Sequence, residues 1–465
     1  MGACACESSE GETHGLVTRD SGKMQHSKKQ RVEQPPSGPT SRATSLTTSP
    51  TPVQIPTTMR ACVWRGDSDP SKMAIETLKT PMPKANEVLI KVKACGVCHT
   101  DLHCIKGEVP FPKPACFGHE ICGEVIMYGP EADPPPLLAG RTLPPVGAKV
   151  IAPFIMPCGR CSFCACGEED TCEPFFRLNR GKGHLYDDTT RLFRPRQGGA
   201  GKCGECAEEE EEDEPIAMYS FAGMAEYAVV PNTAVFPLPD ALVDAGLYAE
   251  SCVLGCAFFT AYGALRNAAG LDVVSGPAGA SKGKSACVIG CGGVGGSVLQ
   301  LLKYAGLSPI IAVDVSDDAL AQATALGATH VVKSSRECDA VEEIAKLTGG
   351  AKVDYCFEVI GLKQTFEQAV MAVRDGGTAC FIGISDVRHK AEVPITHIVR
   401  RRISLVGSYG ARASRDMPAL LEIASKGGVD LKGGVTRRFA LEDAGSAYKL
   451  LSERKIVGRA IVTFE

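Results

Sequence analysis

The sequence predicts an α/β protein in which a β-rich part precedes a doubly wound parallel sheet. Short β-type runs separated by Gly and Pro turns begin at Met59, as in a β-rich domain. Between about residues 284 and 407, six apolar β runs alternate with helical patterns, and a glycine-rich turn joins the first run to its helix. These two observations together predict the fold class.

Length, charge and hydropathy narrow the class of protein. At 465 residues the chain is longer than one ordinary domain of roughly 150 residues, so we expect two or three domains. The net charge of −4, without a basic stripe, disfavours nucleic acid as a partner. No apolar run approaches the roughly 18 residues that span a bilayer, and the N-terminus lacks the apolar block of a secretory signal. We therefore expect an intracellular protein with no membrane span.

Cysteine usage indicates a reducing compartment. The chain has 22 cysteines, several of them spaced as closely as metal ligands are, which indicates bound zinc rather than disulfides. We expect a cytoplasmic location. A mitochondrial or plastid transit peptide is the alternative, but such peptides are poor in acidic residues, and this N-terminus contains Glu7, Glu10, Glu12 and Asp20.

Residues 1–58 are predicted to form a disordered tail, because they are rich in Ser, Thr, Pro, Gly and charge and show no hydrophobic period. The first six residues resemble an acylation signal, yet Cys6 stands where the myristoylation pattern requires Ser or Thr. Modification at Cys4 or Cys6 and a plain flexible end both stay open.

An acidic segment interrupts the β-rich part at residues 198–215. Two glycines open it and a run of acidic residues follows, whose like charges would repel one another in a packed setting. We predict a solvated surface insertion. Cys203 and Cys206 within it offer only two ligands, which do not make a metal site by themselves.

The later part of the chain is predicted to hold six strands, at 286–290, 310–314, 330–332, 354–358, 378–383 and 403–407. The helix predicted at 294–305 carries an apolar stripe at helical spacing, which we assign to the core: Val294, Val298, Leu301, Leu302 and Ala305.

Residues 286–295 fit the phosphate-binding turn of a dinucleotide site. Gly290 permits the turn, Gly292 lets a pyrophosphate approach the backbone, and Gly295 lets helix and sheet pack closely. Gly293 and Val294 belong to the same predicted cofactor site. Glycines alone are weak evidence, but here they lie between a predicted strand and a predicted helix.

Asp314 ends the second of these strands, where an acidic side chain accepts hydrogen bonds from the adenosine ribose hydroxyls. A carboxylate there repels the 2′-phosphate of NADP, so we predict NAD as the cofactor. The alternative is that Asp314 caps the following helix, a role for which Ser316, Asp317 and Asp318 compete.

Cys158, Cys161, Cys164 and Cys172 form a C-x2-C-x2-C-x7-C cluster in a loop. Four thiolates at this spacing can close a tetrahedral structural zinc site, whereas free cysteines would have to crowd there by chance. Cys166 lies inside the same lobe and could compete.

A second set of ligand types is widely spread: Cys98, His119 and Cys256. Three such ligands leave a fourth position for water or substrate, as a catalytic zinc needs. From spacing alone the set is weak, because a lone Cys256 in an apolar stretch is usually a small buried hydrophobe.

With these motifs in hand, the chain from about Met59 to its last residue resembles the zinc-containing alcohol dehydrogenases of the medium-chain dehydrogenase/reductase superfamily. The resemblance rests on residues 93–102, 118–120 and 255–263, the four-cysteine lobe and the glycine turn, in the same order along the chain. It implies a nucleotide-binding Rossmann domain inserted into a GroES-like catalytic domain. The implied limits are 59–257 for the catalytic domain, with the zinc lobe at 157–173, then 258–407 for the NAD domain and 408–465 for the C-terminal part of the catalytic domain.

The resemblance also implies roles for single residues. Cys98, His119 and Cys256 would bind the catalytic zinc, with Glu120 beside the metal and Asp101 supporting His119. The remaining implied roles are substrate contact for Thr100, proton relay for His103, pyrophosphate binding for His99 and Arg459, and apolar substrate walls for Phe154 and Ile384.

The activity implied is hydride transfer between a primary alcohol or aldehyde and NAD, with two zinc ions per chain and a homo-oligomeric assembly. S-(hydroxymethyl)glutathione oxidation is an alternative inside the family, although we find no basic anchor for the glutathione carboxylate. A catalytically silent nucleotide-binding relative is an alternative of another class.

Overall fold

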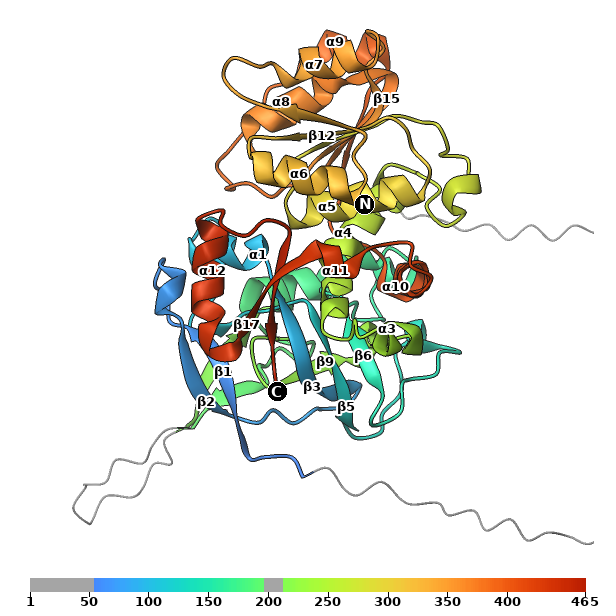
Figure 1. The fold of residues 1–465 in the computed structure, drawn as a ribbon. Coiled ribbons are helices and arrows are strands. Elements are labelled where there is room, and N and C mark those ends of the chain that lie inside the picture. The colour runs from blue at the N-terminus through green and yellow to red at the C-terminus, as the bar shows by residue number, and fades with distance from the viewer. Residues whose placement is uncertain (1–53, 196–211) are drawn as a thin grey trace, which may run out of the picture. The chain divides into compact units, whose positions relative to one another are not determined.

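The computed structural model describes residues 54–195 and 212–465 of the chain (Figure 1). Most of the predicted tail and of the predicted acidic insertion lies outside these residues, as do Cys4, Cys6, Cys203 and Cys206. The insertion ends earlier than predicted, because strand β8 (Glu214–Met218) already begins at Glu214. The reason is local charge pairing, since Arg65 binds the Glu214 carboxylate at 2.7 Å and Lys79 pairs with Asp213.

The first part of the chain is rich in short strands, as predicted. This part and the C-terminal strands described below together form what we call the β lobe. Its strands are β1 (Thr58–Trp64), β2 (Ala74–Lys79), β3 (Glu87–Val97), β4 (Ala115–Cys116), β5 (Ile121–Tyr128), β6 (Lys149–Ala152), β7 (Leu192–Arg194), β8, β9 (Tyr227–Pro231) and β10 (Phe236–Pro237). Its helices are α1 (His99–Ile105), α2 (Ser162–Ala165), α3 (Asp240–Asp244) and α4 (Ala257–Gly263), with a π-helical turn at Phe175–Arg180.

The predicted doubly wound sheet is present and parallel throughout, which confirms the fold class. Its strands run in the order β13-β12-β11-β14-β15-β16, and ligands bind such sheets beyond the carboxyl ends of the strands, where the order reverses. The strands are β11 (Ala286–Ile289), β12 (Ile310–Asp314), β13 (His330–Lys333), β14 (Val353–Glu358), β15 (Val373–Phe381) and β16 (Ser404–Gly407). The helices are α5 (Gly293–Tyr304), α6 (Asp317–Leu326), α7 (Ala340–Leu347), α8 (Lys363–Ala372) and α9 (Ile395–Arg401).

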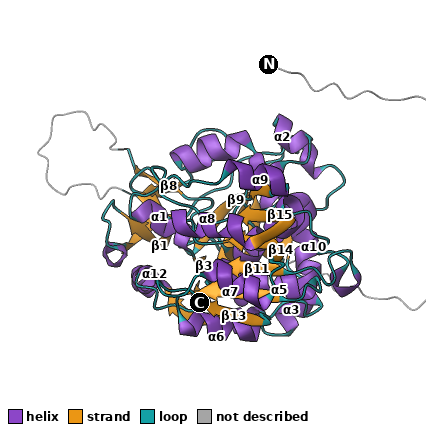
Figure 2. Cartoon of the chain, turned by 90° about the horizontal axis from the view of Figure 1, so that it is seen from above, coloured by secondary structure: helices purple, strands orange, loops and turns teal. Residues whose placement is uncertain are grey.

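Alternate residues of the central strand β11 face two separate apolar cores. Ala286 and Val288 pack with α5 and α6, whereas Cys287 and Ile289 pack with residues of α7 and α8. Because successive strand residues point to opposite faces, helices must cover both sides of the sheet. Figure 1 shows α7 and α8 on one side of this sheet and α5 and α6 on the other, and Figure 2 gives the view from above.

Several predicted boundaries differ from the structure by one residue, and those of strand β15 differ by more. Strand β15 starts at Val373 rather than at 378, because a register shift against β14 lets the polar residues 374–377 join the ladder, a feature that apolar patterning does not reveal. Helix α5 runs over Gly293–Tyr304, and Ala305 is its C-cap. Of the predicted stripe, all but the half-buried Val294 are fully buried.

The end of the chain returns to the first lobe. Strand β18 (Arg459–Thr463) pairs antiparallel with β3, and β17 (Val435–Ala440) pairs parallel with β18. Helices α10 (Ala413–Ser425), α11 (Leu431–Gly434) and α12 (Ala444–Ser452) come before and between them. The parallel sheet is therefore inserted into the β lobe, while the exact domain limits at 257 and 407 stay a prediction.

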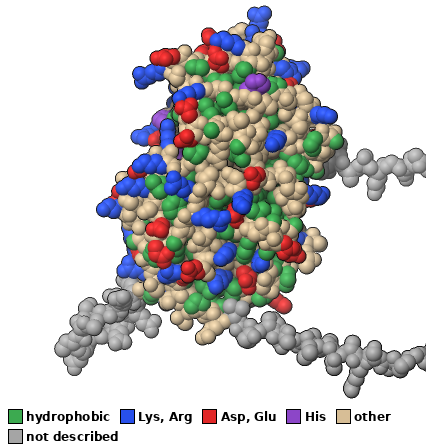
Figure 3. All heavy atoms as spheres, viewed as in Figure 1, with side chains coloured by type: hydrophobic (Ala, Val, Ile, Leu, Met, Phe, Trp, Pro, Cys, Tyr) green, Lys and Arg blue, Asp and Glu red, His purple; other side chains and the backbone are tan. Residues whose placement is uncertain are grey.

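No helix within 54–195 or 212–465 is long and apolar enough to cross a bilayer. On the face drawn in Figure 3, basic and acidic side chains are interspersed rather than segregated.

Candidate active site

Three predicted ligands converge from distant parts of the chain. Cys98 lies between β3 and α1, His119 just before β5, and Cys256 at the N-terminus of α4. Their ligand atoms and a Glu120 oxygen lie within 4.8 Å of one another, and all four residues are buried. The donor set of two sulfurs and one imidazole nitrogen matches that of a catalytic zinc site with one open position.

His119 is oriented as a metal ligand. Its Nδ1 donates to Oδ1 of Asp101 at 2.9 Å, while its buried Nε2 has no hydrogen-bond partner among the described residues. The other oxygen of Asp101 accepts a 2.6 Å hydrogen bond from the buried Tyr448 phenol on α12. A carboxylate that binds one ring nitrogen fixes the tautomer that leaves the other free for a metal, so the residues present fit zinc.

The electrostatics favour a thiolate at this site. The pKa of Cys98 lies well below its usual range, because the Cys256 thiol can donate to its sulfur and because His119 and Arg459 add positive charge nearby. Burial and the same sulfur pair raise the pKa of Cys256. Since both sulfurs must be deprotonated to bind zinc, the metal would replace the proton that the pair shares.

The four cysteines of the predicted structural zinc site also lie close together. The Sγ atoms of Cys158 and Cys164 lie 4.0 Å apart, and those of Cys161 and Cys172 lie 3.9 Å apart. Tetrahedral zinc with Zn–S bonds of about 2.3 Å places its sulfurs about 3.8 Å apart, so the spacing fits the ion. Cys166, the possible competitor, is exposed and outside this cluster.

The glycine turn between β11 and α5 has the features predicted for it. Gly290 has φ of 98°, a conformation that favours glycine. A Cβ on Gly295 would lie 1.9 Å from the Gly290 carbonyl oxygen, whereas one on Gly292 would meet no atom within 4 Å. Gly295 therefore serves helix–strand packing, and Gly292 leaves room for a ligand at the N-terminus of α5.

Asp314 does not cap the next helix, because Ser316 does so by accepting from the amide of Ala319. The Asp314 carboxylate instead accepts amide hydrogen bonds of 2.8 Å from Cys291, of the glycine turn, and from Val315. The alternative reading of Asp314 is thus wrong, and the ribose role stays a prediction.

The metal and nucleotide positions are joined by one ion pair. Arg459, at the start of β18, binds the Glu120 carboxylate, and both side chains are buried. The same guanidinium lies over the first turn of α5, where a Cβ on Gly293 would meet Arg459 Cδ at 2.2 Å. Burial raises the pKa of Glu120 to about 7, although the Arg459 charge opposes that rise.

Models of two domains match this chain: the alcohol dehydrogenase GroES-like domain over residues 84–240 and the zinc-binding dehydrogenase domain over residues 293–426. Together they span more than half of it. The chain belongs to the zinc-containing alcohol dehydrogenase family. It is therefore a zinc-dependent oxidoreductase that uses a nicotinamide dinucleotide, as the resemblance predicted.

Individual relatives support this family assignment. S-(hydroxymethyl)glutathione dehydrogenase of Saccharomyces cerevisiae is 29% identical over 81% of this chain and 89% of its own length. The alcohol dehydrogenase zinc-binding domain protein of Burkholderia ambifaria matches with a TM-score of 0.72 and 28% identity, over 88% of this chain and 99% of its own. Benzyl alcohol dehydrogenase of Acinetobacter calcoaceticus matches with a TM-score of 0.71 and 25% identity, over the same shares.

The structure brings some of the other residues predicted from the family resemblance to the catalytic cluster, but not all of them. The Thr100 Oγ1 lies 3.5 Å from Cys98 Sγ, within hydrogen-bond distance, and His103 on the same helix pairs through Nδ1 with Glu108. Phe154 packs edge-on against His119 with ring centroids 6.0 Å apart. His99 is exposed at the start of α1. Ile384 is half-buried after β15, and no contact with the cluster is seen for it among the described residues.

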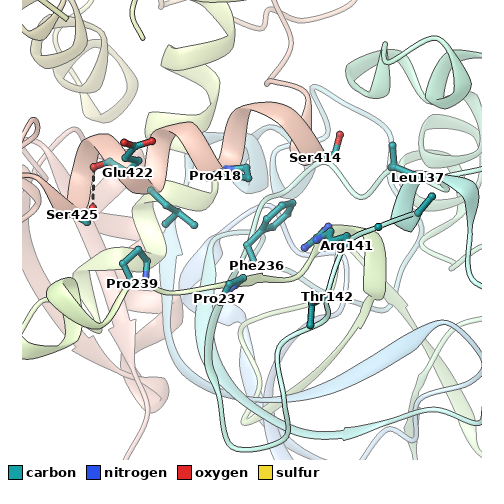
Figure 4. Close-up of a pocket in the computed structure, with 13 residues that line it drawn as sticks. Leu137, Arg141, Thr142, Phe236, Pro237, Pro239, Ser414, Pro418, Glu422 and Ser425 are labelled. Atoms are coloured by element: carbon teal, nitrogen blue, oxygen red, sulfur yellow. Dashed lines mark hydrogen bonds between the residues drawn. The ribbon is translucent and has the colours of Figure 1, made fainter. Parts of the chain in front are cut away.

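Two residues of this dehydrogenase site carried no signal in the sequence. Tyr448 supports Asp101 from a helix near the end of the chain, and Arg180 lies among the aromatic rings beside His119. An open cavity of about 700 Å³ lies elsewhere, between the loop around Arg141 and helix α10, and contains none of the predicted site residues (Figure 4).

Proposed function

We propose that the enzyme oxidises a primary alcohol to its aldehyde with NAD as hydride acceptor and catalyses the reverse reduction. The observation that carries this proposal is the joining of two sites. The cluster of Cys98, His119 and Cys256 is linked through Glu120 and Arg459 to the glycine turn at the start of α5. A hydride donor at the metal and an acceptor at the turn would meet between them.

Each residue of the metal cluster has a proposed role. Cys98, His119 and Cys256 hold zinc, with the Asp101 carboxylate fixing the His119 ring. When bound, the metal supplies Lewis acidity, which lowers the pKa of a ligated hydroxyl and polarises a carbonyl. Thr100 accepts the substrate hydroxyl proton at Oγ1 as it releases its own hydroxyl proton, and His103 takes up the released proton at Nε2, because its Nδ1 is engaged by Glu108.

The proposed cofactor site comprises the glycine turn (Gly290, Gly292, Gly293, Val294 and Gly295), Asp314 and the phosphate-binding residues His99 and Arg459. The α5 amides and the Arg459 guanidinium, which offers a planar set of donors, would bind the pyrophosphate. Asp314 would accept the ribose hydroxyls and disfavour NADP.

The test is NADH formation from a panel of primary alcohols by protein whose zinc content has been measured. Turnover with NAD and about two zinc ions per chain is expected. Cys98→Ala should abolish turnover, whereas Cys104→Ala, a change of a buried cysteine on α1 outside the cluster, should keep it. Zinc and NAD binding without turnover of any alcohol or aldehyde would instead indicate the catalytically silent relative.

A second candidate is S-(hydroxymethyl)glutathione dehydrogenase activity, because the yeast relative bears this name. A relative in Paracoccus denitrificans bears the same name and is 29% identical over 82% of this chain and 94% of its own length. Formaldehyde oxidation compared with and without glutathione separates the two. A strict requirement for glutathione would favour this candidate.

The proposed assembly is a homo-oligomer in the cytoplasm. Strand β16 is an edge strand of the parallel sheet, and Ile395 and Val399 on the neighbouring helix α9 are 78% and 72% exposed. Such apolar exposure is typical of a covered interface. Light scattering during gel filtration would measure the assembly.

The described cysteines are all free thiols, as in a reducing compartment, and fractionation of cells would distinguish cytoplasm from organelles.

A further inference from the structure

Arg180, the last residue of the π-helical turn at Phe175–Arg180, lies in an aromatic cage. Its Cζ is 4.0 Å from the ring centroid of Tyr219, 4.6 Å from that of Phe175 and 5.8 Å from that of Phe154. Its Nε donates to the Tyr409 hydroxyl at 3.3 Å. Guanidinium groups stack well on such rings, which hold the charge without neutralising it.

This cage borders the catalytic cluster. The rings of Tyr219 and Phe154 pack against His119, with centroids 5.5 and 6.0 Å away, so one aromatic ring separates Arg180 from a predicted zinc ligand. Tyr409 comes two residues after β16 and packs edge-on against Phe154. Arg180 therefore lies near the carboxyl end of the parallel sheet, the end at which such sheets bind nucleotide.

Hydrogen bonds of the neighbouring residues hold the segment around Arg180 in place. The side-chain amide of Asn179 donates to the carbonyl of Ser220 at 2.9 Å and accepts from its amide at 3.0 Å. The Ser220 hydroxyl donates in turn to the Phe154 carbonyl at 3.1 Å. Ser220 holds φ of 50°, an uncommon conformation for a residue with a side chain, which is often found at functional sites.

The charge of Arg180 lacks a counter-ion. Among residues 54–195 and 212–465 no carboxylate is seen in an ion pair with it; its Nη1 donates to the Asn179 side-chain oxygen at 3.3 Å, and its buried Nη2 has no hydrogen-bond acceptor. A buried donor without a partner destabilises the folded state, and a charged donor does so more than a neutral one. An anion that enters the site would remove this cost.

We propose that Arg180 binds a carboxylate on the substrate, so that the preferred substrates are primary alcohols and aldehydes bearing an acid group away from the reacting carbon. This inference rests on the proposed function and names its substrate class. A planar guanidinium matches a carboxylate, and the surrounding rings match an apolar or aromatic linker between the acid and the hydroxyl.

The test compares acid and neutral substrates of the same shape. Values of kcat/KM are measured for para-(hydroxymethyl)benzoate against benzyl alcohol, and for ω-hydroxy carboxylates of increasing length against the matching alcohols. S-(hydroxymethyl)glutathione is included as a different source of carboxylate. The variants are Arg180→Gln, Arg180→Lys and, as the matched control, Arg177→Gln, since Arg177 is an exposed arginine of the same turn, paired with Glu173.

The wild type should prefer at least one acid, and Arg180→Gln should lower kcat/KM for that acid about 100-fold while changing the neutral partner little. Arg180→Lys should keep part of the preference, and Arg177→Gln all of it. A wild type that treats acid and neutral substrates alike overturns the proposal. So does an Arg180→Gln variant that loses both equally, which would assign the arginine to packing or to a bound water.

Calorimetric binding of para-methylbenzoate to the NAD complex gives a readout that needs no turnover. Binding by the wild type and Arg177→Gln, but not by Arg180→Gln, supports the carboxylate site even if no alcohol is oxidised and the proposed function fails. If the wild type does not bind para-methylbenzoate and turns over neutral alcohols only, the proposed carboxylate site is wrong. The dehydrogenase function would in that case still be supported.

Discussion

The phenol of Tyr448 donates a 2.6 Å hydrogen bond to Asp101, although 347 positions separate the two residues in the chain. Asp101 in turn accepts from Nδ1 of His119, so helix α12 supports the predicted metal ligand from behind. This relationship leads to the first prediction.

Tyr448→Phe should weaken zinc binding at the catalytic site about 10- to 100-fold, because the Asp101 carboxylate loses one of its two partners. Competition with a chelator measures the affinity, and the absorption of the cobalt-substituted enzyme reports the ligand geometry. Tyr128→Phe, which removes a phenol bound to the Pro144 carbonyl, is the control. Equal zinc affinity in both variants would limit Tyr448 to packing.

Cys161→Ser should remove one zinc ion per chain and lower the Tm by about 5 °C or more, because a structural zinc site contributes directly to folding free energy. Cys166→Ser changes an exposed cysteine of the same lobe and should alter neither value. Zinc analysis and thermal unfolding provide the two readouts. An unchanged zinc content in Cys161→Ser would contradict the four-cysteine site.

Two glycines of the same turn should respond differently to alanine. Gly295→Ala should destabilise the protein, because its Cβ would lie 1.9 Å from the Gly290 carbonyl oxygen. Gly292→Ala should leave the Tm unchanged, since its Cβ meets no atom within 4 Å, but should weaken NAD binding by obstructing the pyrophosphate. Thermal unfolding and NAD titration separate these effects, and tight NAD binding by Gly292→Ala would place the cofactor elsewhere.

Asp314→Asn should lower the preference for NAD over NADP about tenfold or more, because the charge that repels a 2′-phosphate is removed and one acceptor oxygen is lost. Asp317→Asn, at the first residue of α6 and paired with Lys333, is the control. Steady-state kinetics with both cofactors give the ratio. An unchanged ratio would mean that Asp314 does not select the cofactor and only accepts hydrogen bonds from the three backbone amides that it binds in the structure.

Local patterns predicted most of the fold. Apolar runs located all six parallel strands, and the glycine spacing located the turn before α5, since both signals lie within about a dozen consecutive residues. The start of β15 was missed because residues 374–377 are polar and join the sheet only through a register shift.

The candidate site could be predicted only in part. Its ligand residues were identified through the family resemblance, and their assignment to zinc stays a prediction. No local sequence pattern predicts the roles of Tyr448, Arg180 or the Glu120–Arg459 ion pair. These residues reach the site only when α12, the π-helical turn and β18 pack around β3 and α1.

The return of β18 to β3 constrains the order in which this protein can assemble during synthesis. Arg459 and the strand that seals the first sheet are translated after the whole parallel sheet, so the inserted lobe is available to fold while the surrounding lobe still lacks its partner strand. The end of β3 next to Cys98 therefore has an unpaired edge until residue 463 has been translated. The complete enzyme, with both the metal cluster and the nucleotide site in place, is accordingly a late product of translation.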